Sequence, residues 1–255
     1  MLDLSDPFCE REAWSDVAAG ERTADVLLEL LPQLIRSPAS PAMRGAIRIL
    51  AERFGASDEQ GPPGRSGEHA IALNNHAFDL RNAGRLEEAE WLMRAALATD
   101  LVVRPANHPK VPHRRNNLGT VLLMRGRVSE AREQVTRAWQ ETGDRYDVTS
   151  ARILTVRLVI AVIDHEPHEV FLGQLKSHLA IRPMLNVADV DRYWKMVPVL
   201  AALAPRLHAD DVGLLKAIVG VLNGSLLREA LEPMPRWRDA PSLPLDTVWP
   251  AECPI

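Results

Sequence analysis

The 255 residues carry a formal net charge of −4, and 46% of them are hydrophobic while 25% are charged. These values are ordinary for a soluble globular protein of one or two domains. They argue against nucleic-acid-binding proteins, because phosphate binding needs a concentrated basic face. They also argue against membrane proteins, because no uninterrupted apolar run approaches the roughly 18 residues of a membrane helix.

The cysteines and the first residues bear on the compartment. The two cysteines, Cys9 and Cys253, stand near opposite ends of the chain, unlike the closely spaced cysteines of a disulfide scaffold. The acidic start, residues 1–8, lacks the apolar core of a signal peptide. We therefore expect a cytoplasmic protein. The abundance of alanine and the excess of arginine over lysine hint at a bacterial source.

Residues 1–55 are predicted to be a helical segment. Amphipathic patterns cover 23–36 and 42–54, and Pro41 suits the first turn of the second helix. The two helices are expected to form a hairpin, and the sequence leaves open whether this hairpin joins the elements that follow. Residues 56–68 are rich in glycine, proline and serine, which predicts a flexible linker.

An internal repeat follows the linker. Residues 73–97 and 115–139 align without a gap at an offset of 42 residues, as between Asn74 and Asn116. The identical pairs are Asn74 with Asn116, Asn75 with Asn117, Leu80 with Leu122, Gly84 with Gly126, Arg85 with Arg127, Glu88 with Glu130, Ala89 with Ala131, and Ala96 with Ala138. Each copy predicts two antiparallel helices. The central glycine lies where the chain must reverse, a place for positive φ or close approach.

These residues resemble the tetratricopeptide repeat family. The positions that carry the resemblance are Ala77, Leu80, Gly84, Ala89, Met93 and Ala96 in the first copy, and Leu118, Gly119, Leu122, Gly126, Ala131, Val135 and Ala138 in the second. The paired asparagines and the 42-residue period are similar to the kinesin-light-chain subtype. His76, Leu80 and Leu122 depart from the family pattern. The resemblance implies an all-α, right-handed α-α superhelix, that is, a TPR-like solenoid.

The repeat region is predicted to span residues 69–182, with a third, degenerate copy. The first helix of this third copy is expected from Val148 to Ile163, and its second helix from Pro167 to about Leu179. When the third copy is aligned with the second, Glu166 in the connecting turn is placed opposite Gly126. The run 153–163 is rich in β-branched residues and alone would be compatible with a strand. Its position between helical hairpins favours a helix.

The C-terminal third is predicted to hold another helical hairpin and a tail. Residues 183–232 form the hairpin, whose first helix is interrupted by Pro198. Residues 233–255 contain six prolines and cannot be helical throughout. Trp237 and Trp249 are interpreted as anchors that hold this proline-rich tail against the helical body or against a partner. Trp139, by contrast, is expected in the core.

The best candidates for function are the asparagine pairs Asn74–Asn75 and Asn116–Asn117. Asparagine is unfavourable inside a helix, so four of them in register indicate that the amides are used. The resemblance implies that first-helix residues line a concave groove, where the amides bind the backbone of a partner segment. In the alternative interpretation, they bond the backbone of neighbouring helices within the solenoid.

Further groove candidates share that first-helix face: Phe78, Arg81, Asn82, His113, Arg114 and Thr120. The arginines among them, with Arg115, favour an acidic partner through charge-assisted hydrogen bonds. A solvated basic face is the alternative. Residues 164–169 contain metal-ligand residue types, but their spacing matches no familiar metal site and a polar turn is the better interpretation.

No motif of an enzyme or cofactor site is recognised in the sequence, so no catalytic residue, metal or cofactor is expected. The predicted function is that of an adaptor that binds a peptide or protein segment on the concave face of its repeats. The alternative is a non-catalytic accessory subunit of an enzyme complex, and an enzyme is the least favoured hypothesis. The partner and the oligomeric state stay open.

Overall fold

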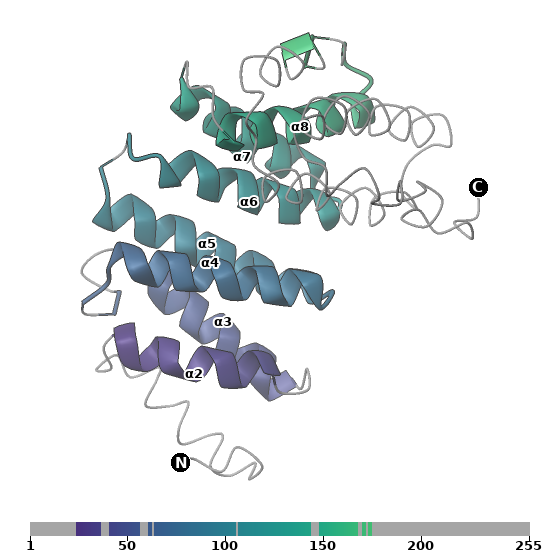
Figure 1. The fold of residues 1–255 in the computed structure, drawn as a ribbon. Coiled ribbons are helices and arrows are strands. Elements are labelled where there is room, and N and C mark those ends of the chain that lie inside the picture. Colours follow the sequence, from purple (N-terminus) through teal and green to yellow (C-terminus); the bar gives the residue numbers. More distant parts are fainter. Residues whose placement is uncertain are drawn as a thin grey trace, which may run out of the picture. The chain divides into compact units, whose positions relative to one another are not determined.

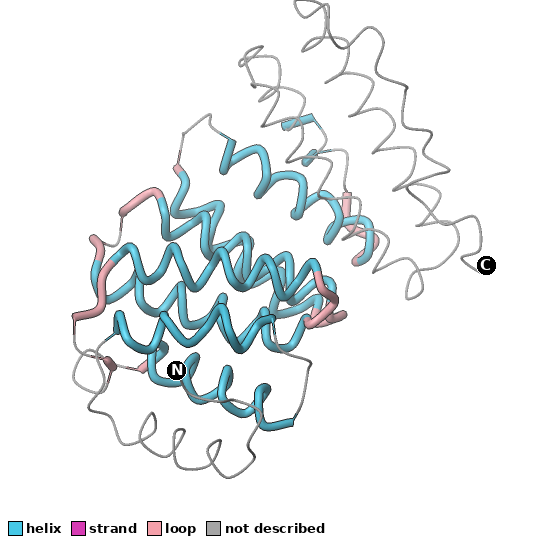
Figure 2. Tube along the Cα trace, turned by 60° about the horizontal axis from the view of Figure 1, so that its bottom comes forward, coloured by secondary structure: helices cyan, strands magenta, loops and turns pink. Residues whose placement is uncertain are grey.

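The computed structural model describes residues 24–36, 41–56, 61–62, 64–105, 107–143, 148–167, 170–171 and 173–174. Every regular element within these ranges is a helix, as Figures 1 and 2 show. The chain divides into two compact units, residues 1–121 and 122–255. No helix in the described ranges is both long and apolar enough to span a bilayer.

Four helices make up most of the first unit: α2 (Ala24–Arg36), α3 (Pro41–Gly55), α4 (Gly67–Asn82) and α5 (Leu86–Val103). Helix α2 packs on α3 and α4, and α5 packs on both α3 and α4 (Figure 1). Equivalent helices of the two hairpins are therefore neighbours. The predicted N-terminal hairpin is confirmed, and it stacks on the first repeat instead of standing apart.

Small and large apolar side chains both contribute to the core of this unit. Ala70 and Ala77 on α4 and Ala89 on α5 are fully buried, and the two helices pack on each other. Larger buried side chains fill the remaining space: Leu31, Ile47, Leu50, Phe54, Leu73, Leu80, Leu92 and Met93. A hairpin with one apolar face cannot bury it alone, so stacking supplies the hydrophobic stabilisation of each.

Polar contacts fasten the hairpins to each other. Arg65, at the end of the predicted linker, donates from Nη1 to the carbonyl oxygens of Phe54 at 3.1 Å and Ala56 at 2.7 Å. Arg85 Nη1 donates to the carbonyl oxygen of Ile35 at 3.0 Å. Both arginines thus satisfy carbonyl groups at the C-terminal ends of α2 and α3, which have no partner within their own helices.

The second repeat copy comprises α6 (Lys110–Met124) and α7 (Val128–Thr142), and the boundary between the units falls within α6. The turn that precedes α7 reproduces the turn that precedes α5. Gly84 has φ +75° and Gly126 has φ +76°, which confirms the predicted positive φ. Each turn closes with a backbone hydrogen bond of 2.9 Å, from Arg85 N to Leu80 O and from Arg127 N to Leu122 O.

An arginine–glutamate pair follows each of these glycines. Arg85 donates to Glu88 Oε1, with 2.7 Å between Nη2 and the oxygen, and Arg127 donates to Glu130, with 2.6 Å from Nη2 to Oε2. The glutamates lie in the first turn of α5 and α7, where the helix dipole favours negative charge. Identical residues at the repeat offset therefore build identical turns.

Helix α8 (Val148–Ile163) packs on α7 in the second unit. Its bounds match the predicted helix, and a strand at this run is excluded. Nearly every side chain from Ile153 to Val162 is buried, as expected for a helix that is apolar on all sides. Arg157 is the exception and is half-buried.

The turn after α8 corrects the predicted register of the third copy. His165, with φ +55°, occupies the left-handed position that Gly126 has in the second copy. Glu166 N donates to Ala161 O at 2.8 Å and so takes the place of Arg127 N. Setting Glu166 against Gly126 was therefore wrong by one residue. Histidine is one of the residue types enriched in this conformation, so no glycine signal is present in the sequence.

Gly84→Ala is expected to destabilise the first unit by about 1–2 kcal/mol, because a side chain at positive φ is strained. A Cβ at Gly84 would meet no atom within 4 Å, so the backbone alone is responsible. Gly45, within α3, also has open space but no positive φ. Gly45→Ala should stabilise by about 0.5–1 kcal/mol. Chemical denaturation of both variants measures the difference, and equal effects would contradict this account of the turn.

Candidate functional site

The accessible part of the predicted site lies on one face of α4. Asn75 and Asn82 are exposed, and Phe78 and Arg81 are half-buried. Spacings of three, four and seven residues place these side chains on neighbouring positions of the helix surface. We name this set, Asn75, Phe78, Arg81 and Asn82, the α4 face.

Arg81 is the charged centre of the α4 face. Its guanidinium carbon lies 4.6 Å from the centroid of the Phe78 ring, and Nη2 donates to Asn82 Oδ1 at 3.1 Å. No carboxylate pairs with Arg81 among the described residues. Burial lowers the pKa of the guanidinium from its usual value. The α4 face therefore carries an arginine whose charge is balanced by no acidic neighbour in the described part of the chain.

Three of the four paired asparagines, Asn74, Asn116 and Asn117, are buried, and a hydrogen bond between two of them joins two helices. Asn117 on α6 donates from Nδ2 to Oδ1 of Asn74 on α4 at 2.8 Å. The partners are 43 residues apart, one more than the sequence repeat, so this bond joins non-equivalent positions. It is the intramolecular use that the alternative interpretation anticipated, although it links two side chains and not a side chain to a backbone.

Asn116 is the repeat equivalent of Asn74, but its carbonyl oxygen is buried and accepts no hydrogen bond from any described residue. Thr120, also buried, donates to the Asn116 backbone oxygen at 2.8 Å. His113, from the same predicted set, is half-buried near the start of α6.

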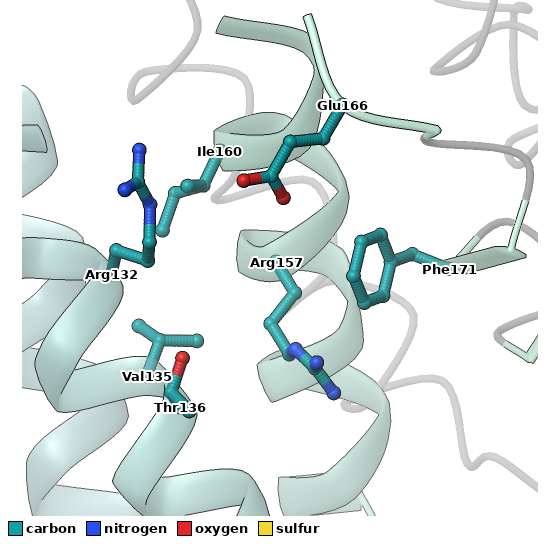
Figure 3. Close-up of a pocket in the computed structure, with 7 residues that line it drawn as sticks. All are labelled: Arg132, Val135, Thr136, Arg157, Ile160, Glu166 and Phe171. Carbon is teal, nitrogen blue, oxygen red and sulfur yellow. The ribbon is translucent and has the colours of Figure 1, made fainter. Parts of the chain in front are cut away.

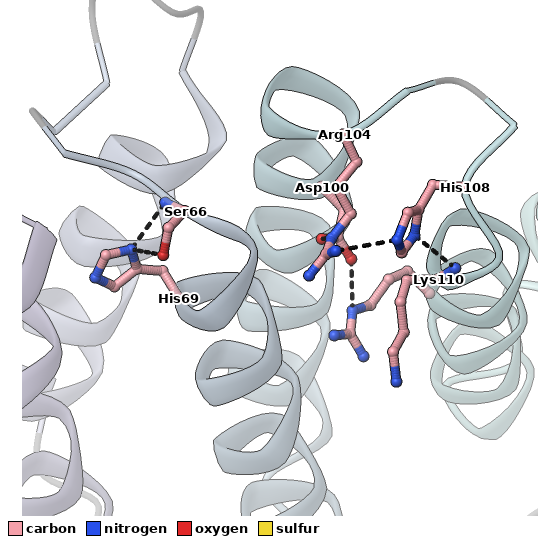
Figure 4. A network of polar contacts seen from close by, with 7 residues as sticks. Ser66, His69, Asp100, Arg104, His108 and Lys110 are labelled. Carbon is pink, nitrogen blue, oxygen red and sulfur yellow. Dashed lines mark hydrogen bonds and ion pairs between the residues drawn. The ribbon is translucent and has the colours of Figure 1, made fainter.

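Asp100 organises the connection between α5 and α6. It is fully buried, and Arg104 Nε and Arg114 Nε donate to its two carboxylate oxygens at 2.6 and 3.0 Å. His108 lies 3.1 Å from Arg104 and accepts the Lys110 backbone N–H at 3.2 Å (Figure 4). The predicted groove residue Arg114 is thus used inside the protein. Its Nη2 atom is buried without a partner in the described structure.

Gly67, the first residue of α4, makes room for this cluster. A Cβ atom at Gly67 would overlap the guanidinium of Arg104. A larger residue here would make the Arg104 side chain shift from its position beside Asp100.

A serine, a histidine and an aspartate meet at the start of α4. Ser66 Oγ and the Asp25 carboxylate each lie 2.9 Å from a ring nitrogen of His69. The order of groups is that of a hydrolase triad, but His69 Nδ1 already accepts the Ser66 backbone N–H at 2.9 Å (Figure 4). His69 thus takes the place of the glutamate in a capping box. The cluster caps the N-terminus of α4 and ties it to α2.

Other sequence predictions have mixed outcomes. Trp139 is half-buried and not in the core, and the guanidinium of Arg157 lies over its ring. The polar turn at 164–167 is confirmed. Trp237, Trp249 and the predicted elements after residue 174 lie outside the described residues. Asp100 was missed, although an aspartate within the apolar pattern of a helix was the signal that could have found it.

Asp100→Asn is expected to destabilise the first unit by about 3–5 kcal/mol, because it leaves Arg114 as a buried charge without a counterion. Glu133→Gln is the matched control, since Glu133 pairs with Arg137 on the exposed surface of α7. Its effect should stay within about 1 kcal/mol. Thermal and urea denaturation measure both. A loss for Asp100→Asn no larger than that for Glu133→Gln would contradict the assigned role.

Comparison with known proteins supports the repeat. Residues 68–139, which run from α4 to α7, match the tetratricopeptide repeat family model. No curated protein is similar enough to the chain to count as a match. These residues are therefore a tetratricopeptide repeat region, and such a region suggests a role in protein–protein interaction.

Proposed function

We propose that this protein is an adaptor that binds an acidic segment of a partner protein on the first-helix face of its tetratricopeptide repeats. The single observation that carries the proposal is Arg81 on the accessible α4 face, which no carboxylate of the described residues pairs. An acidic partner would supply the missing countercharge. Charge-assisted hydrogen bonds of this kind are about twice as strong as neutral ones.

The α4 face also has the composition of a binding surface. Phe78 offers apolar contact area, and the guanidinium stacked on its ring keeps its N–H edges available for carboxylates. Asn75 and Asn82 are exposed and offer both donors and acceptors to a polypeptide backbone. The α4 face is the first point of contact in this proposal.

The buried candidates take part only in a second step. Their proposed contact with a partner involves Asn74, His113, Arg114, Asn116, Asn117 and Thr120. Asn116 is the strongest of them, because an unpaired buried acceptor costs about 1–3 kcal/mol and a partner N–H would remove that cost. It is 4% exposed, so a partner reaches it only by displacing the side chains that cover it.

The finer assignments belong to the same proposal. The paired asparagines and the 42-residue period support repeats of the kinesin-light-chain type. The stacking of α2 and α3 on α4 and α5 supports a solenoid that begins before the matched region, with a first-helix face that is concave. A non-catalytic, cytoplasmic protein fits these features.

The proposal is tested with peptides selected from a random display library on the immobilised full chain. The selected peptides should be rich in aspartate and glutamate. Arg81→Gln should weaken their binding by about tenfold or more, which corresponds to about 1.4 kcal/mol. Fluorescence anisotropy with a labelled peptide measures the affinity.

Arg48→Gln is the control for that measurement. Arg48 is an exposed arginine on α3, already paired with Glu52 at 2.8 Å, and lies outside the α4 face. Its substitution should change the affinity less than about twofold, as for an exposed, screened charge. Selected peptides without acidic residues, or equal losses in the two variants, would overturn the proposal.

A further inference from the structure

A pocket in the second unit lies between α7 and α8 and the turn that follows α8 (Figure 3). Its lining residues are Arg132, Val135, Thr136, Arg157, Ile160, Glu166 and Phe171. Its volume is about 70 Å³. One water needs about 10–15 Å³ by this measure, and pockets for whole small molecules usually have about 300 Å³ or more. The pocket therefore suits the polar end of a side chain.

Arg157 supplies the charge in this pocket. Its guanidinium carbon lies 4.5 Å from the centroid of the Phe171 ring and 5.3 Å from that of Trp139. These distances are those of cation–π contacts, and such contacts leave the N–H groups of a guanidinium able to donate to a ligand. Within the described residues Arg157 makes no hydrogen bond or ion pair.

The other charged groups that line the pocket bear on whether its ligand is an anion or a cation. Arg132 is paired with Asp164, so these two charges balance each other. Glu166 lies in the lining but forms no ion pair with Arg157, although its charge partly offsets the lowering of the Arg157 pKa by burial. Arg157 therefore remains the one described cation of the pocket without a paired carboxylate.

Thr136 adds a hydroxyl group that is not used within the helix. Thr120 and Thr142 donate to backbone oxygens four residues earlier, at 2.8 and 2.7 Å. No such bond is made by Thr136 in the described structure, where its side chain borders the pocket (Figure 3). A free hydroxyl and a fixed guanidinium together can hold an anionic group.

We infer that the pocket around Arg157 and Thr136 is a binding site for a single carboxylate, supplied by a glutamate or aspartate side chain of a partner polypeptide. The small volume excludes a whole cofactor, and the planar fork of arginine matches a carboxylate. The inference rests on the proposed function, because it adds a second contact to a protein that binds an acidic partner. The pocket shares no residue with the α4 face.

The site is tested on the full chain with a blocked glutamate, N-acetylglutamate methylamide, and with its glutamine counterpart. The readout is the NMR resonance of the Arg157 Nε–H group, assigned by its loss in Arg157→Lys. The glutamate probe should shift this resonance in a saturable manner, and the glutamine probe should not. No shift with the glutamate probe would overturn the inference. The titration itself is carried out on the unsubstituted chain, and Arg157→Lys serves only to assign the resonance.

Two variants with opposite expected effects on binding affinity extend the test. Arg157→Gln should weaken binding of a blocked hexaglutamate peptide by about tenfold, because a charge-assisted bond is lost. Glu166→Gln should strengthen it, because a competing carboxylate is removed from the lining. Arg137→Gln, on the exposed surface of α7, is the matched control and should have an effect below about twofold. Equal losses for Arg157→Gln and Arg137→Gln would overturn the inference.

Two further measurements separate this site from the proposed function and from other anions. Arg81→Gln should leave the Arg157 shift by the glutamate probe unchanged, so failure at one site is visible without failure at the other. Inorganic phosphate at equal concentration should shift the Arg157 resonance less than the glutamate probe. A larger phosphate shift would overturn the assignment to carboxylates.

Discussion

The fold depends on one backbone requirement: the chain must reverse between paired helices through a residue at positive φ. Gly84, Gly126 and His165 all meet it, and each is followed by the same closing hydrogen bond to the helix just ended. The reversal fixes where the next helix begins and which of its faces meets the previous one. Apolar residues at helical spacing then find each other because the turn has already set their register.

Polar groups decide how the hairpins of the first unit are joined. Arg65 and Arg85 bond the open carbonyl ends of α3 and α2, and Asn117 bonds Asn74 between α6 and α4. Each bond joins residues far apart in the sequence. Since a buried polar group without a partner is costly, these contacts favour one arrangement of the stack over others of equal hydrophobic burial.

Arginine has two different uses in this chain. Arg104 and Arg114 are structural, because both donate to the buried carboxylate of Asp100 inside the first unit. Arg81 and Arg157 lie against aromatic rings, are only partly buried and have no carboxylate partner in the described structure. The contrast separates charges that hold the fold from charges that no described carboxylate pairs.

The sequence by itself determined the helical repeat, its 42-residue offset, the positive φ at both glycines and the bounds of α8. It could do so because these features depend on local spacing and on the conformational freedom of glycine. Only the tertiary structure decided that the N-terminal hairpin stacks on the repeats, that Asn74 pairs with Asn117 and that Asp100 neutralises Arg114. It also moved Trp139 from the expected core to a partly exposed place beneath Arg157. Each of these depends on which side chains distant in sequence come into contact, and a pattern of spacing within one segment carries no information about that.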